Sequence, residues 1–450
     1  MCRLAPVLVV VGFAASCTQS ESPVEPRSHL PAAALATADP PGYQAIDLGT
    51  LGGRNTVPAA LNDRAQVTGY SESSDRVSHA FLWEDSVMHD LRIAPTGSGD
   101  PGSATSAGEA INRFGEIAGT RFSDELSQVE VFVWDTLTPA PIRTGLFRDL
   151  DDGGIRLNPG TRVIGVTDGG DVLATEFSDF FGNRAVLWNQ GTRQVLPGLN
   201  PDGESIPWAM NAAGQGAGSS YLYPRGSPYA GYYFHPVLWD GGRVIDLGVL
   251  APRACPTPGP TACGVGVATA LSDAPVVVGW TLDSAYLVRA FRWHADTLSD
   301  LGAFPGLPTI AYAVNDRGQV AGNWNFSPPG GGFLWEDGVT TDLGSLGGGM
   351  TRVKAINEAG EIVGSSLAAG GGQHAFVWRD GQMLDLGVGP LPNQAAIAIA
   401  INSHGDVLGI AGNCQKYYDT TCGIVSPTRG VLWRRLTPAS AAVAGRGRGP

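Results

Sequence analysis

The chain has 450 residues and a formal net charge of −13 at pH 7, and it is rich in glycine (63) and proline (32). Charged residues make up 16% and hydrophobic residues 43%, which suits short strands joined by turns and argues against long helices or a wholly disordered chain. The acidic balance disfavours nucleic acid or an anionic membrane surface as a partner, because both require basic patches.

Residues 1–17 are typical of an export signal. Arg3 precedes an apolar run over residues 7–15 that is too short to span a bilayer. Residues 14–17, Ala-Ala-Ser-Cys, resemble the lipobox of bacterial lipoproteins, so Cys17 is the expected lipidation site. Ala14 stands where that pattern prefers a large aliphatic residue, and plain signal cleavage is the alternative.

The residues after Cys17 bear on the expected location. Thr18 is not the Asp that signals inner-membrane retention in such lipoproteins. We therefore expect an exported protein that touches the outer membrane or cell surface through a lipid anchor only, with secretion or a periplasmic location as the alternative. Residues 18–42 are rich in Pro, Ala and Ser and are expected to form a flexible tether.

A short phrase recurs along the rest of the chain. Its clearest copies begin at Ala313 and Ala355 and read Ala-(Val/Ile)-Asn-x-x-Gly-x-(Val/Ile)-x-Gly. Weaker copies begin at Ala60, Ala110, Ala209, Ala270 and Ala400, and one unit, from about Val163, has lost the Asn. Each unit carries one tryptophan of the series Trp83, Trp134, Trp188, Trp239, Trp293, Trp335, Trp378 and Trp433. Units of roughly 40–55 residues have the length of propeller blades.

Each unit contains the signals of four antiparallel strands. Asn-x-x-Gly joins two short β-branched runs as a hairpin turn, and Asp-Gly after the tryptophan marks a second turn. Both faces of His79-Ala80-Phe81-Leu82-Trp83 carry apolar side chains, so this strand should be covered on both sides. The repeated Trp is expected to pack between blades, and the Asp of Asp-Leu-Gly to bond backbone amides or the neighbouring blade.

The two ends of the repeat region complement each other. Residues 43–53 match the end of a unit, residues 341–348, whereas the last unit stops at Trp433-Arg434-Arg435 without its final strand. A ring would close if the N-terminal strand completed the last blade, which would remove exposed strand edges. We therefore predict an all-β propeller of about eight four-stranded blades over residues 43–435, with seven blades as the alternative, followed by a disordered tail over 436–450.

The repeated phrase is similar to that of a known family. Ala-Ile-Asn-x-x-Gly-x-Val-x-Gly followed by His-Ala-Phe-x-Trp resembles the HAF repeat of bacterial extracellular proteins, and residues 79–81 and 374–376 read His-Ala-Phe. The resemblance covers roughly residues 43–435. It implies an exported bacterial repeat protein from a family without an assigned activity.

Two cysteine pairs indicate small disulfide loops. Cys255 and Cys263 enclose seven residues, as do Cys414 and Cys422. A metal site is the alternative, but neither spacing is that of a zinc knuckle and no His lies close by. The acidic turns at 149–153 and 168–171 are expected to be solvated rather than to bind calcium. We expect no metal and no cofactor.

Loops of variable length gather on one rim of the predicted ring, where binding residues usually lie. The candidate binding residues are aromatic or cationic: Tyr221, Tyr223, Arg225, Tyr229, Tyr232, Tyr233, Tyr417 and Tyr418. Rigid rings give large contact areas at low entropic cost, which suits protein or glycan partners. The alternative is that these rings only pack the loop onto the top of its blade.

The first strand of each blade should line a central channel. Its candidate lining residues are Glu109, Trp208, Tyr312 and Lys354, together with Pro58, Thr269 and Ile399. A glycosidase requires two converging carboxylates, and only one is present. The sequence thus favours a monomeric, non-enzymatic scaffold that binds protein or polysaccharide. The alternative is a cell-envelope polysaccharide hydrolase or lyase that uses Glu109 at the channel mouth, and no catalytic residue is assigned.

Overall fold

The computed structural model describes residues 40–91, 105–123, 128–134, 148–149, 161–178, 182–189, 192–224, 226–256, 260, 262–389, 395–416 and 422–436. The side chains of residues 122–123, 128, 148–149, 178, 414–416 and 422–426 are not among those described. The predicted signal with Cys17, most of the tether, and the tail from residue 437 lie outside these ranges, so they stay predictions.

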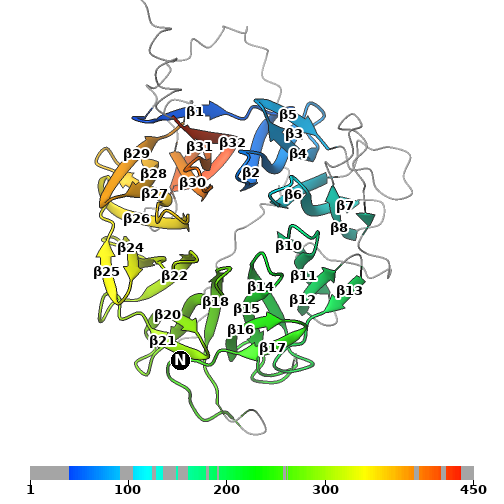
Figure 1. Cartoon of the computed structure of the whole chain (residues 1–450), viewed down its shortest axis with the longest axis vertical. Coiled ribbons are helices and arrows are strands. Elements are labelled where there is room, and N and C mark those ends of the chain that lie inside the picture. Colours follow the sequence, from blue (N-terminus) through cyan, green and yellow to red (C-terminus); the bar gives the residue numbers. More distant parts are fainter. Residues whose placement is uncertain are drawn as a thin grey trace, which may run out of the picture. The chain divides into compact units, whose positions relative to one another are not determined.

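The described residues form eight four-stranded antiparallel sheets, and each sheet is one blade (Figure 1). Blade 1 comprises β2 (Gly52–Leu61), β3 (Val67–Ser73), β4 (Ser78–Glu84) and β5 (Val87–Asp90). Blade 2 comprises β6 (Thr105–Ile111), β7 (Ile117–Ser123), β8 (Gln128–Trp134) and β9 (Arg148–Asp149). Blades 3 and 4 comprise β10 (Arg162–Val166), β11 (Val172–Ser178), β12 (Gly182–Asn189), β13 (Thr192–Val195), and β14 (Ser205–Met210), β15 (Gly216–Tyr221), β16 (Phe234–Asp240), β17 (Arg243–Asp246).

Blades 5 and 6 comprise β18 (Gly266–Leu271), β19 (Val277–Leu282), β20 (Val288–His294), β21 (Thr297–Asp300), and β22 (Thr309–Val314), β23 (Val320–Trp324), β24 (Gly331–Glu336), β25 (Val339–Asp342). Blades 7 and 8 comprise β26 (Gly347–Ile356), β27 (Ile362–Ala368), β28 (Gln373–Arg379), β29 (Gln382–Gly387), and β30 (Ala395–Ile401), β31 (Val407–Lys416), β32 (Cys422–Arg435), β1 (Tyr43–Asp47). The prediction of eight blades is confirmed, and the seven-blade alternative is wrong because the unit without Asn still forms β10–β13.

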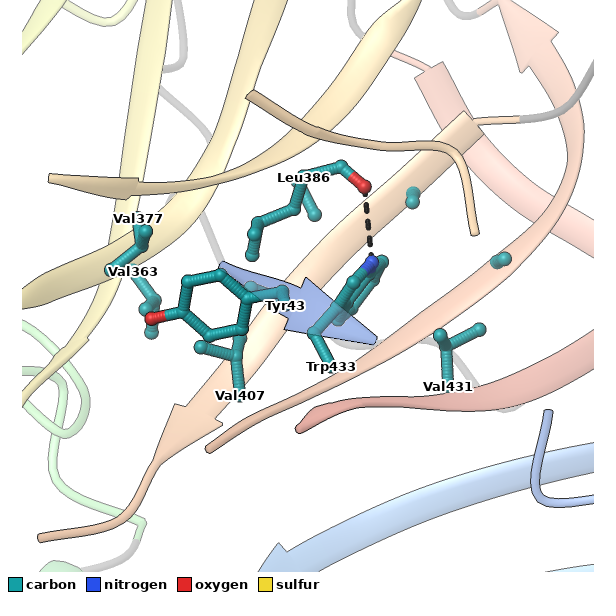
Figure 2. Close-up of a cluster of buried hydrophobic side chains, with 11 residues drawn as sticks. Tyr43, Val363, Val377, Leu386, Val407, Val431 and Trp433 are labelled. Carbon is teal, nitrogen blue, oxygen red and sulfur yellow. Dashed lines mark hydrogen bonds between the residues drawn. The ribbon is translucent and has the colours of Figure 1, made fainter. Parts of the chain in front are cut away.

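The last blade is completed by the N-terminal strand, as predicted. β1 pairs antiparallel with β32, from Tyr43 opposite Arg435 to Asp47 opposite Val431. Figure 2 shows Tyr43 on β1 within a cluster that includes Val363 and Val377 of blade 7. Tyr43 and Trp433 are fully buried in this cluster, and the Trp433 indole Nε1 donates a hydrogen bond of 3.0 Å to the Leu386 carbonyl. The closing strand therefore contributes to a core that two blades share.

The first strand of every blade is the innermost one. β2, β6, β10, β14, β18, β22, β26 and β30 contact one another in succession, and β30 contacts β2 to close the ring. Figure 1 shows these strands facing the centre, with β5, β13, β17, β21, β25, β29 and β1 on the outside. Residues on the first strands are therefore the ones that can face the axis.

The repeated tryptophans pack between blades, as the sequence predicts. Trp378 of blade 7 lies in one cluster with Ala321, Leu334 and Leu343 of blade 6. Trp83 of blade 1 packs in the same way against Leu408 and Leu432 of blade 8, across the closure. Seven of the eight are buried, and Trp335 is half-buried. Each blade thus uses its neighbour to cover an aromatic surface that it cannot bury alone.

The repeated Asn joins blades as well as closing its own turn. In blade 7 the Asn357 Oδ1 accepts hydrogen bonds from the backbone N–H groups of Ala359 and Glu361. Its Nδ2 donates to the Glu361 carboxylate and, at 3.1 Å, to the Asn402 carbonyl of blade 8. The sequence indicated the turn but not this bond to the next blade.

The same inter-blade bond recurs around the ring. It runs from Asn62 to Asn112, Asn112 to Thr167, Asn211 to Ser272, Asn315 to Asn357, Asn357 to Asn402, and Asn402 back to Asn62. In the two other blades the position holds Thr167 and Ser272, whose side chains have no amide to donate. The ring of Asn bonds therefore has six members and two gaps.

The first residue of the His-Ala-Phe phrase pairs with the Asp of Asp-Leu-Gly on the adjacent strand. His79 Nδ1 lies 3.0 Å from the Asp90 carboxylate, and His374 Nδ1 lies 2.9 Å from that of Asp385. His235 with Asp246 and Arg289 with Asp300 repeat the pair. The same Asp accepts the backbone N–H two residues later, as Asp385 does from Gly387 at 2.7 Å. The predicted bonds from this Asp to backbone amides are confirmed.

One predicted disulfide is present. Cys255 and Cys263 are bonded, with their Cα atoms 5.0 Å apart. The Cys414 and Cys422 side chains lie outside the described ones, so the second disulfide stays a prediction.

Candidate functional site

Most described tyrosines of the candidate binding loop pack inward. Tyr223 is buried, its ring centroid lies 5.3 Å from that of Tyr229 and 5.8 Å from that of Tyr233, and its hydroxyl donates a hydrogen bond to the Pro256 carbonyl. These rings share a cluster with Cys255 and Cys263. They therefore hold the loop onto the segment that the disulfide closes, which is the structural alternative stated from the sequence.

Two other tyrosines of this loop differ from that group. Tyr221 is half-buried against Phe234, with ring centroids 5.2 Å apart, and Phe234 lies edge-on to Trp280. Tyr232 is 68% exposed. Arg225, Tyr417 and Tyr418 lie outside the described residues. Of the described candidates on this loop, Tyr232 has the most accessible ring.

A second exposed aromatic residue, which the sequence did not single out, lies in the neighbouring blade. Tyr286, in the turn between β19 and β20, is 68% exposed, and the Arg253 guanidinium lies 3.5 Å from its ring centroid. Two backbone hydrogen bonds join Arg253 to Cys263, so the disulfide segment positions this arginine. Tyr286 stands apart from the tyrosine-rich loop over residues 221–233, so the sequence pattern does not mark it as a binding residue.

These features belong to adjacent segments. The Phe234 N–H donates to the Gly264 carbonyl, and the Leu282 N–H donates to the Val265 carbonyl. The segment around residues 248–266 therefore runs between the loop that carries Tyr232 and the turn that carries Tyr286. We call Tyr232, Arg253 and Tyr286 the rim surface of blades 4 and 5.

The inner strands present one special position to the axis. Each has a β-bulge, in which one extra residue is left out of the pairing and its side chain is redirected. The eight bulge residues are Ala59, Glu109, Ile164, Trp208, Thr269, Tyr312, Lys354 and Ile399. The four main channel candidates predicted from the sequence, Glu109, Trp208, Tyr312 and Lys354, all occupy this position. Pro58 does not: it is buried, and Ala59 takes its place.

Glu109 is held in the wall rather than free. It accepts hydrogen bonds from the Thr120 hydroxyl, at 2.9 Å, and from the Val163 backbone N–H of blade 3. Burial raises the pKa of Glu109 to about 7, although these two hydrogen bonds and the nearby Arg162 favour the charged form. The carboxyl therefore joins two blades and titrates near neutral pH.

The opposite part of the wall is cationic and aromatic. Burial lowers the pKa of Lys354, and the charge of Arg352 lowers it further. Burial raises the pKa of Tyr312 despite the opposing effect of Arg352. Lys354 and Tyr312 are nevertheless accessible to solvent. The shifted pKa values and the solvent accessibility both follow from a position on the inner wall of the propeller, where a side chain meets solvent on one side and protein on the others.

A pocket of about 350 Å³ opens at the rim of the Asn turns. It is lined by residues of blades 7, 8, 1 and 2, among them Leu61, Asp63, Ile111, Arg113, Glu358 and Ile401. The sequence placed binding on the other rim, with its long loops, so this pocket was missed. The sequence feature that could have revealed this pocket is the apolar residue directly before each Asn of the repeat.

Metal-ligating and acidic side chains were sought among the described residues. No group of three or more His, Cys, Asp and Glu among them could hold a metal ion. Glu109 is the one carboxylate among the eight bulge residues. No helix in the described ranges is long and apolar enough to cross a membrane.

The chain was compared with known proteins. No family model matches the chain, and no curated protein matches it. Solved propellers resemble it distantly. The β-propeller domain of the Trilobed protease from Pyrococcus furiosus is 12% identical, with a TM-score of 0.45 over 74% of this chain and 94% of that one. TolB from Acinetobacter baumannii is 10% identical, with a TM-score of 0.34 over 73% of this chain and 79% of that one. A mutant of Aleuria aurantia lectin is 11% identical, with a TM-score of 0.32 over 77% of this chain and 100% of that one.

Proposed function

We propose that the chain is an exported, lipid-anchored propeller that binds a polysaccharide or a protein without transforming it. The observation that carries this proposal is the rim surface of blades 4 and 5. Its two tyrosines are each 68% exposed, and Arg253 lies over one of them. Exposed rings beside a cation on a rigid support are the residues that dominate binding surfaces.

The role of the repeated residues supports this assignment. The repeated Trp, Asn, His and Asp side chains all bond or pack within the scaffold. Tyr232 and Tyr286 belong to none of these sets, and their exposed rings do not contribute to the core. Tyr232 and Tyr286 are therefore free to contact a partner.

The decisive experiment measures binding of the purified chain to an array of bacterial envelope polysaccharides and to purified surface proteins. The double variant Tyr232→Ala/Tyr286→Ala should weaken the strongest interaction at least tenfold. The matched control is Val339→Ala, which removes an exposed side chain from the outer strand of blade 6. Equal binding by the double variant and the wild type would refute the rim surface as the site.

The alternative is an envelope polysaccharide hydrolase or lyase with Glu109 as its acid. Incubation of the same polysaccharides with the chain should release no shortened product. Product release that Glu109→Gln abolishes would establish the alternative instead.

The location is part of the proposal. The lipobox-like residues and the resemblance to the HAF repeat family support an exported lipoprotein. Metabolic labelling with a fatty acid should mark the wild type and not Cys17→Ser. A labelled Cys17→Ser variant would exclude Cys17 as the lipidation site.

A further inference from the structure

The axis wall of the propeller carries side chains that the fold does not need. At the bulge position, Ala59 and Thr269 show that a small residue suffices, yet blades 4 and 6 hold Trp208 and Tyr312. These two aromatics are 42% and 36% exposed. Two residues before the bulge, six blades have the aliphatic side chains Val57, Ala107, Ile206, Val267, Ile310 and Ile397, whereas blades 3 and 7 have Arg162 and Arg352.

The cations of the wall are Arg162, Arg352 and Lys354. Among the described residues, no carboxylate lies within ion-pair distance of Arg162, Arg352 or Lys354, although the chain as a whole has a net charge of −13. Glu109 is near Arg162 but bonds Thr120 and Val163 instead. Positive charge on the inner face of a ring attracts anions, since the surrounding protein weakens solvent screening.

One cation of the wall lies over an aromatic ring, and a second cation lies close enough to an aromatic residue to act on its pKa. The Arg162 guanidinium carbon lies 5.9 Å from the ring centroid of Trp208 on the next blade. Tyr312 lies on blade 6, next to the blade that carries Arg352 and Lys354, and the charge of Arg352 acts on both Tyr312 and Lys354. Arg352 also donates a hydrogen bond of 2.9 Å to the Phe326 carbonyl, which fixes its position.

The two groups lie on opposite sides of the axis. Arg162 and Arg352 belong to blades 3 and 7, which are four blades apart in a ring of eight. The intervening bulge residue Thr269 is small and polar, and the wall on blades 8 and 1 is aliphatic, with Ile399 and Ala59. The cations and aromatics therefore lie between blade 3 and blade 7, in two groups that face each other across the axis.

We propose that this wall is a second binding site, separate from the rim surface, for an oligosaccharide that carries carboxylate groups. The faces of Trp208 and Tyr312 stack against sugar rings, whose axial C–H groups form an apolar surface. Arg162, Arg352 and Lys354 bind the carboxylates, and the arginines offer the planar fork that matches a carboxylate. A purely anionic ligand would leave the aromatic rings without a role, and a neutral glycan would leave the cations without one.

The test is a calorimetric titration of the full-length chain with tetragalacturonate, with a neutral tetrasaccharide of galactose as the comparison. We expect the acidic sugar to bind and the neutral one to bind at least tenfold more weakly. Raising the salt concentration should weaken binding of the acidic sugar only.

The variants copy residues that other blades already hold at the same positions, so the fold is preserved. Arg162→Val/Arg352→Ile should weaken tetragalacturonate binding at least tenfold, and Trp208→Thr should also weaken it several-fold. The control Arg243→Gln, which removes an exposed cation on the outer strand β17, should bind as the wild type does.

Several results would overturn the inference. Absence of wild-type binding, equal binding of the neutral sugar, or unchanged affinity in the arginine double variant each contradicts it. Equal affinity for tetraglutamate that Trp208→Thr leaves unchanged would assign the site to acidic peptides instead. Loss of binding in Tyr232→Ala would mean that the rim surface binds this sugar. The rim proposal is tested by its own variants and does not depend on these outcomes.

Discussion

At the scale of single residues, the repeated Asn does more for this protein than close a turn. In Asn357 the side-chain oxygen accepts two backbone N–H groups of its own turn. Its amide group donates one hydrogen bond to the Glu361 carboxylate and one to the Asn402 carbonyl of the next blade. Because these groups are buried, leaving any of them unpaired is costly. The two blades without Asn provide a natural comparison.

Asn357→Ser should lower the free energy of unfolding by about 1–3 kcal/mol, because the Asn402 carbonyl and the Glu361 carboxylate lose a donor. Thr167→Asn should raise it by about 1 kcal/mol by adding the missing bond to blade 4. Chemical denaturation of both variants and the wild type measures these changes in the free energy of unfolding. An unchanged Asn357→Ser variant would mean that water replaces the lost bonds at no cost.

Glu109 makes stability depend on pH. Burial raises its pKa from an ordinary value of 4.5 to about 7, so between these values the folded chain binds a proton that the unfolded chain has released. Its contribution to stability therefore falls as pH rises from about 4.5 to 7.

Glu109→Gln removes this dependence. The free energy of unfolding of the variant, relative to the wild type, should increase by on the order of 3 kcal/mol between about pH 4 and pH 8. Asp202→Asn, at an exposed carboxylate, is the control and should show no such trend over pH 5–8. A constant difference for Glu109→Gln would show that the carboxyl is already charged in the folded chain at neutral pH.

At the scale of elements, the interface between adjacent blades is the unit of stability. Each sheet has both faces covered by neighbours, and the tryptophan at the end of its third strand reaches into the preceding blade. Removing that indole leaves a cavity between two sheets. The sheets cannot close the cavity by moving together, because the closed circle of blades holds both of them in place.

Trp378→Ala should therefore lower the free energy of unfolding by about 3–5 kcal/mol. Tyr286→Ala, which removes an exposed aromatic ring, should change it by less than about 0.5 kcal/mol. Denaturant titration of both variants separates the two cases. A loss below about 1 kcal/mol for Trp378→Ala would contradict the packing between blades.

The sequence predicted the strands and the interfaces well because every unit restates the same local chemistry. It predicted side chains at the axis less well. The sequence predicts Pro58 at the axis, whereas the structure has Ala59 at the bulge and Pro58 buried. An inserted residue shifts the side-chain alternation by one, and the period-two pattern of the sequence does not show where the insertion lies. The rim could not be resolved either: Tyr223 and Tyr232 look alike in sequence, and only packing distinguishes the buried ring from the exposed one.

At the scale of the whole molecule, closure depends on a short strand far from its partner in the sequence. β1 supplies the outer edge of blade 8, and Tyr43 lies in the core shared by blades 7 and 8. Without β1, the pairing groups of β32 would be exposed as a free edge.

A chain that begins at residue 50 should melt at a lower temperature than the full chain and should self-associate as its concentration rises. A chain that begins at residue 40 keeps β1 and is the matched control. Thermal melting and light scattering test both. If the two truncated chains behave alike, the closing strand does not stabilise the ring.

The Asn bonds also give the ring a direction. Every such bond runs from one blade to the next along the chain, and the last runs from Asn402 to Asn62, so donor and acceptor surfaces always meet in the same order. Such head-to-tail contacts resemble those of cyclic oligomers, in which identical subunits join through two different surfaces. A duplicated or deleted unit brings both surfaces with it. Recombination within a gene that encodes such repeats can therefore change the number of blades without requiring a new kind of contact between them, provided that the angle between neighbouring blades still closes the circle.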